Sequence, residues 1–215
     1  MTEKPIGAPV SVSTAAPGQN AALTFAGIAG QRVSLKLSGV TIGGSTCCSA
    51  KVWILKPGGS SLVAGTLFGT SGGFVDTKML PASGTYRLVL DPQGMDVGSA
   101  TATLYDVSPD VTGSLTVGGP GANVSLGTPG QNALLTFSGA AGQRVSVRAS
   151  AVTIGTSTCC SFVLSIKRPD GVTVATATLG TNGGTVSATL SVAGTYSVLV
   201  DPQSASTGSV LVGLS

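Results

Sequence analysis

Histidine is absent from this chain of 215 residues, and Glu3 is its only glutamate. The chain therefore lacks the usual general base and the commonest zinc ligand. The seven aspartates are scattered, and the sequence has no glycine-rich loop ending in Lys-Ser or Lys-Thr to cradle a phosphate. These absences predict a protein that is not an enzyme, with no catalytic residue, metal site or cofactor.

Charged residues are also scarce, at 9% of the chain, and the net charge is only +3. The lysines and arginines do not gather into a basic face, which argues against a nucleic-acid partner. Hydrophobic residues make up 42%, too many for a disordered chain. No run approaches the roughly 20 apolar residues of a membrane span, so membrane insertion is not expected. Ser, Thr, Asn and Gln supply most of the solubility, which is common in secreted bacterial proteins and predicts an extracellular or cell-surface location.

The chain does contain a long internal repeat. Gly30-Gln31-Arg32-Val33-Ser34 recurs 112 residues later, as does Ser45-Thr46-Cys47-Cys48-Ser49. Gly84-Thr85-Tyr86 recurs 110 residues later, so the second copy lacks two residues, one near Phe68 and one near Met79, where we expect turns. Each copy of about 100 residues is large enough to bury its own core. We predict two domains, at residues 7–106 and 119–215, joined by a short, semi-rigid linker at residues 107–118.

The two ends of the chain suggest a fragment of a larger protein. Met1-Thr2-Glu3-Lys4-Pro5 has no apolar core behind it and does not read as a signal peptide. Leu214-Ser215 aligns with Leu104-Tyr105, where the first copy continues into its linker. The alternative is a small complete protein exported by another route.

Alternation with a period of two residues runs through both copies, and the helical period is missing. Val33, Leu35 and Leu37 share one face of a strand, opposite polar neighbours. We expect eight strands in the first copy, separated by glycine-rich turns: residues 9–14, 21–26, 31–38, 50–56, 61–68, 73–80, 84–91 and 99–107. This pattern predicts an all-β fold of two tandem antiparallel β-sandwiches, jelly-roll-like, with an immunoglobulin-like sandwich as the alternative.

The order of these motifs resembles a known family. That order is Gly-Gln-Asn, an apolar strand, Ala-Gly-Gln-Arg-Val, long strands, Lys-Pro-x-Gly, Gly-Thr-Tyr and Asp-Pro. In this order of motifs the chain resembles the bacterial pre-peptidase C-terminal (PPC) domain family and its relatives. The resemblance covers residues 18–107 and 130–214. It implies a β-sandwich accessory module of a large secreted or surface protein, including proteins of the YD-repeat (Rhs) type. The paired cysteines depart from the family pattern, and no binding residues are carried over.

Two pairs of adjacent cysteines, Cys47-Cys48 and Cys159-Cys160, are the most specific chemical feature. Adjacent strand residues point to opposite faces, so neither pair suits a zinc ion. A bridge between the copies would need Cα atoms about 5.5–6 Å apart, and equivalent positions of two domains should lie much farther apart. The remaining alternatives are a vicinal disulfide within each pair, which a secreted location favours, and free thiols.

Three further features are candidate binding or interface positions. Trp53 stands on the outer face of its strand, where it would pack at an edge or interface or, alternatively, stack on a sugar. Arg32 and Arg144 recur at a strand start, and we expect each to pair with a nearby acid, Asp91 or Asp201, rather than to bind an anion. Asp91 and Asp201 are weak candidates for Ca²⁺, and the sequence favours a turn at Asp-Pro-Gln.

These features predict a non-enzymatic extracellular structural or spacer module, with other domains of its parent protein as partners. The first alternative is a module that binds carbohydrate or protein through the cysteine loops or Trp53. The second is self-association into a filament, in which the strand at residues 5–14 of one chain completes a sheet of the next.

Overall fold

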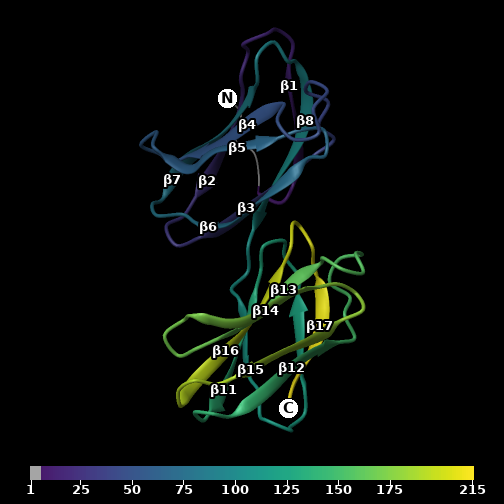
Figure 1. The fold of residues 1–215 in the computed structure, drawn as a ribbon. Helices are drawn as coiled ribbons and strands as arrows, with labels where there is room; N and C mark the ends of the chain where they lie inside the picture. The colour runs from purple at the N-terminus through teal and green to yellow at the C-terminus, as the bar shows by residue number, and fades with distance from the viewer. Residues whose placement is uncertain (1–5) are drawn as a thin grey trace. The chain divides into compact units, whose positions relative to one another are not determined.

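The computed structural model describes residues 6–215, which form two compact units that divide between Val107 and Ser108 (Figure 1). Every regular element among the described residues is a strand, as the alternating pattern predicted. None of these residues belongs to a helix long and apolar enough to cross a membrane. The all-β prediction is confirmed.

The first unit is a sandwich of two four-stranded sheets. One sheet has the order β1-β8-β3-β6 and the other the order β2-β7-β4-β5. All of the pairings are antiparallel, and this order is that of an eight-stranded jelly roll. The strands are β1 (Pro9–Thr14), β2 (Ala21–Gly27), β3 (Arg32–Ser38), β4 (Ala50–Leu55), β5 (Ser61–Phe68), β6 (Gly73–Met79), β7 (Gly84–Pro92) and β8 (Gly98–Asp106).

The second unit repeats this order and adds one strand. Its sheets run β10-β17-β12-β15 and β14-β13-β16-β11-β9, and β9 pairs with β11 in parallel. The strands are β9 (Val111–Ser114), β10 (Ala122–Leu126), β11 (Ala133–Gly139), β12 (Arg144–Ser150), β13 (Phe162–Lys167), β14 (Thr173–Leu179), β15 (Gly184–Thr189), β16 (Gly194–Pro202) and β17 (Gly208–Leu214). Residues 107–118, expected to form a linker, thus contribute a strand to the second unit.

Alternate residues of each strand enter a core between the two sheets. Along β4 the burial alternates strictly, with Ala50, Val52 and Ile54 inside. Each core contains a stacked aromatic pair, Phe25 with Tyr86 and Phe137 with Tyr196. Each tyrosine is fully buried, and its hydroxyl donates to a backbone oxygen four residues earlier, so no polar atom of the ring is left without a partner.

The two residues that distinguish the copies lie within strands, contrary to our expectation of turns. The β4–β5 register shifts between Val52 and Ile54, and the β3–β6 register shifts between Val33 and Leu35. Neither shift occurs at the matching positions of the second copy. Each extra residue therefore forms a β-bulge, which absorbs an insertion without moving the core residues on either side.

Candidate functional site

The cysteine pairs lie at one end of each sandwich, in the loop that enters β4 or β13. Both pairs form vicinal disulfides, Cys47–Cys48 and Cys159–Cys160, with Cα atoms 3.8 Å apart. All four residues are exposed, and the described residues include no free cysteine. The predicted vicinal disulfides are confirmed, and the free-thiol alternative is excluded.

Serine residues on both sides hold the first disulfide loop. The Ser45 Oγ accepts the N–H groups of Cys47 and Cys48, each at 3.3 Å. The buried Ser49 donates its hydroxyl to the Ser45 carbonyl at 3.1 Å. Ser157 and Ser161 make the same bonds in the second unit, at 3.3 Å, 3.3 Å and 3.0 Å. These serines have a structural role that sequence reasoning missed, although their repetition beside the cysteines was the available signal.

The loop also packs tightly on the neighbouring turns. Ser45 O accepts the N–H of Thr70 at 2.9 Å, and Ser49 O accepts that of Gln93 at 2.8 Å. A methyl group added at Gly69 would overlap the backbone of residues 45–47, so only glycine fits there. Gly180 lies equally close to the backbone of residues 157–159 in the second unit. The disulfide loop is therefore fixed by the β5–β6 and β7–β8 turns and by their counterparts.

The disulfide loops themselves, residues 45–49 and 157–161, are uncharged and oxidised. Their exposed groups are sulfurs, the hydroxyls of Ser and Thr, and peptide groups. A disulfide between neighbouring residues closes a very short chain segment, so it restrains the loop without joining distant strands. The disulfides need an oxidising compartment to persist.

Intact-mass spectrometry tests the disulfides directly. We expect the unreduced protein to weigh two hydrogens less per bridge than the reduced protein, and iodoacetamide to leave it unmodified under denaturing conditions. Peptide mapping should place each bridge within a single Cys-Cys peptide. A peptide linking Cys47 or Cys48 to the second unit would contradict the assignment.

Trp53 lies on the outer face of β4, as the alternation predicted, and is half-buried. It stands opposite the bulge in β5 formed by Ala64 and Gly65, and its indole covers Gly65. Ser165 holds this position in the second unit and hydrogen-bonds Thr176 at 2.9 Å. The bulge and Trp53 occur together in one copy, which favours edge packing as the role of the indole.

Replacing Gly65 with alanine is expected to displace the indole. The added methyl group would lie 2.7 Å from Trp53 Cζ2, closer than carbon atoms approach, so the ring must swing toward solvent. Because Trp53 is the only tryptophan, its emission should shift to the red. Gly58→Ala is the matched control, since nothing lies within 4 Å of its added methyl group. Identical spectra for both variants would show that the indole does not rest on Gly65.

The expected pairing of Arg32 with Asp91 is wrong. Arg32 begins β3, whereas Asp91 stands near the end of β7 in the other sheet. The start of β7 lies beside the end of β2, and the chain passes from the end of β2 directly into β3 at Arg32. Asp91 is about seven residues further along β7, which places it roughly 20 Å from the end of the sandwich where Arg32 lies. The same topology separates Arg144, the first residue of β12, from Asp201 in β16.

Asp91 and Asp201 themselves belong to strands. Asp91 and Pro92 end β7, where Asp91 is paired with Lys51 of β4, and the turn begins only at Gln93. Asp201 is paired with Val163 at the matching position. Within the described part of the chain, no group of three or more His, Cys, Asp or Glu side chains is placed to hold a metal ion.

Comparisons with known proteins add little to this geometry. No family model matches the chain, and no curated protein matches it. Among solved structures, the CUB1-EGF-CUB2 domains of human MASP-1/3 align with 96% of the chain and 99% of their own length, at 9% identity and a TM-score of 0.26. The M60 catalytic domain of Clostridium perfringens ZmpB with its two CBM51 domains aligns with 92% of the chain and 34% of its own, at 8% identity and a TM-score of 0.30.

The CupB6 tip adhesin of Pseudomonas aeruginosa aligns with 95% of the chain and 88% of its own, at 8% identity and a TM-score of 0.23. Likeness this low carries no functional argument. Any function must be argued from the residues of this chain.

Proposed function

We propose that the chain is a pair of non-enzymatic structural modules from an extracellular or cell-surface bacterial protein, related to the PPC domains. Its main support is the exposed disulfide at the same loop of both units, because such bonds persist outside the cytosol. The features common to both copies are core residues, turns and loop anchors, which maintain a fold rather than a reactive site. The partners are other domains of the parent protein.

The connector between the units supports a spacer role. Ser108 hydrogen-bonds Thr128 at 3.2 Å, and the Gln131 side chain donates to the Pro109 carbonyl at 2.8 Å. Asp110 accepts the N–H of Asn132 at 3.3 Å, and β9 begins at the next residue. The connector is therefore anchored to the second unit from Ser108 onward and leaves little free chain there, as a structural role would require.

Limited proteolysis tests the structural role. We expect a protease of broad specificity to leave residues 108–114 uncut in the folded chain, because cleavage needs locally unfolded backbone. The matched variant Gln131→Ala removes the contact to Pro109 and should speed cleavage at this segment. Rapid cutting of the unmodified connector would contradict the proposal.

A binding role is the second candidate, and one observation favours it. In the first unit the exposed disulfide lies beside the β7–β8 turn, where Met95 is 80% exposed and Val97 is 39% exposed. Exposed apolar side chains gathered on loops are typical of a contact surface. A glycan array with the unmodified chain, Trp53→Ala and Met95→Ser separates the roles. The spacer role expects no hits, whereas a hit lost in one variant would establish binding and locate it.

Self-association through the first strand would require a rearrangement. Pro5 lies outside the described residues, and Pro9–Thr14 already forms β1, which pairs with β8 of its own unit over six residues. To complete a sheet of another chain, β1 would have to leave β8. Size-exclusion chromatography at rising concentration distinguishes monomers from such assemblies.

A further inference from the structure

The two units differ at one sheet edge. In the second unit, β9 covers the outer edge of β11. The equivalent strand of the first unit is β2, and among residues 6–215 no strand pairs with its outer edge. An open edge with free peptide groups is a template for another strand.

The attachment of β9 shows what such an edge accepts. Val111 to Ser114 run parallel to Ala133 to Thr136, one residue against one. Backbone bonds join the N–H of Val111 to Asn132 O at 2.9 Å and the N–H of Leu115 to Thr136 O at 2.8 Å. The Leu115 side chain, 5% exposed, is part of the hydrophobic core. The segment is thus held by its backbone and by one leucine anchor.

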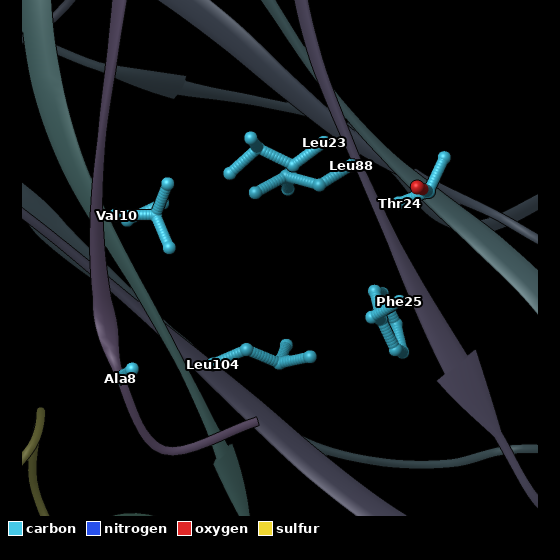
Figure 2. Close-up of a pocket in the computed structure, with 8 residues that line it drawn as sticks. Ala8, Val10, Leu23, Thr24, Phe25, Leu88 and Leu104 are labelled. Atoms are coloured by element: carbon cyan, nitrogen blue, oxygen red, sulfur yellow. The ribbon is translucent and has the colours of Figure 1, made fainter. Parts of the chain in front are cut away.

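The first unit has an apolar groove where the second unit has this leucine. The groove is lined by β1, β2 and β8, with Leu88 of β7, and Figure 2 shows Val10, Leu23, Phe25 and Leu104 around an unfilled space. Leu23 and Leu104 are only partly buried, whereas their counterparts Leu135 and Leu214 are 1% and 4% exposed. Loss of Leu115 from the second unit would leave the same kind of space there and would uncover Leu135 and Leu214 in the same way.

We propose that this groove binds an extended segment with the chemistry of residues 110–115, which adds to the sheet parallel to β2 and inserts a leucine between β1 and β2. Another module of the same kind supplies this segment, from a connector that carries a short strand followed by a leucine, as residues 110–115 do here. The connector of a second copy of this chain is not the occupant, because its own β11 and core already hold it. Only the source of the segment, another module of the same kind, depends on the structural role proposed above; the binding of such a segment in the groove does not.

The second unit shows which peptide groups of β2 face the open edge. A strand residue directs its N–H and C=O to the same side. Thr136 accepts from Leu115, so the N–H and C=O of Thr136 face β9. Thr24 stands at the matching position of β2, opposite Arg87 as Thr136 stands opposite Ser197. Ala22 and Thr24 therefore present their peptide groups to the open edge.

Nuclear magnetic resonance titration of the full 215-residue chain tests the groove. The probe is a synthetic peptide of residues 108–117, and the expected result is saturable shifts at Ala22, Thr24 and the Leu23 and Leu104 methyl groups. A peptide with Leu115→Asp should bind at least about tenfold more weakly, because it loses the burial of one leucine. The Thr24→Pro chain, without that N–H, should lose binding, whereas Thr24→Val should retain it.

The outcomes separate the alternatives. Shifts that do not saturate, shifts confined to other residues, or equal binding of the Asp peptide would overturn the proposal. Self-association of the chain that protects the Ala22 and Thr24 amides from exchange would make a second copy the occupant and overturn our choice. Because the peptide substitution changes the ligand and leaves the chain intact, the test stands even if Thr24→Pro fails to fold. None of these results alters the proteolysis of residues 108–114, by which the structural role is judged.

Discussion

Leu115→Ala is expected to destabilise the second unit by about 2–4 kcal/mol, the usual cost of removing a buried leucine from a core. In a unit of about 100 residues this should lower its thermal midpoint by roughly 8–20 °C. Leu115 packs on β11 from a segment outside the eight-stranded sandwich, so its loss should also release β9. Calorimetry measures the midpoint, and hydrogen exchange at the Val111 and Leu115 amides reports the release.

The control for this effect is Val117→Ala, two residues farther along the same segment. Val117 is 41% exposed, so its truncation should change stability by less than about 0.5 kcal/mol. The first unit should be unaffected by either change, because residues 108–117 belong to the second unit. An equal loss in both variants would mean that Leu115 contributes no more than a surface residue.

Gly180→Ala is expected to destabilise the second unit by about 1–3 kcal/mol, the usual cost of an extra methyl group where nothing can yield. The new carbon would overlap Ser157 O, Thr158 C and Cys159 N, all of them backbone atoms. The disulfide loop would have to lift from the β14–β15 turn, losing the bond from the Thr181 N–H to Ser157 O. Calorimetry checks the stability, and the rate of reduction of Cys159–Cys160 by a small thiol should rise as the loop loosens.

Gly127→Ala in the same unit provides the comparison, because nothing lies within 4 Å of its added methyl group. Its midpoint and reduction rate should match those of the unmodified chain. If Gly180→Ala also leaves both quantities unchanged, the loop does not rest on Gly180 and the repeated glycine has no structural purpose there.

The strands were predictable because the signal for them is local. Two local patterns placed all eight strands of the first unit within two residues of their observed ends. One is the alternation of apolar and polar residues, as at Val33, Leu35 and Leu37, and the other is glycine between the strands. The sandwich follows because each strand has one apolar face to bury. Strand β9 was not predictable in this way, because Val111-Thr112-Gly113-Ser114 has one large apolar residue and a proline two residues before it. Its pairing with β11 depends on Leu115 and on an edge formed by distant residues.

The candidate site was predictable only in part. Adjacent cysteines in both copies argued against a zinc site and against a bridge between the copies, but they left a vicinal disulfide and free thiols as alternatives, which only the structure separates. Gly69 and the serine anchors were missed because their role depends on contacts across loops. The Arg32 pairing failed because sequence motifs give the order of strands but not which end of a sandwich each residue occupies. The bulges escaped for a related reason, since an insertion within a strand and one in a turn look alike in sequence.

The disulfides also bear on how the modules would respond to tension. Each joins neighbouring residues, so it bridges no two strands and shortens the unfolded chain by almost nothing. A unit of about 100 residues pulled open would extend to roughly 350 Å, nearly the full contour of its backbone. Cross-links between distant strands would limit that extension to a fraction of it. If the chain belongs to a surface protein, as proposed, a unit pulled open under load would lengthen by nearly its full contour, while its oxidised loops stay closed.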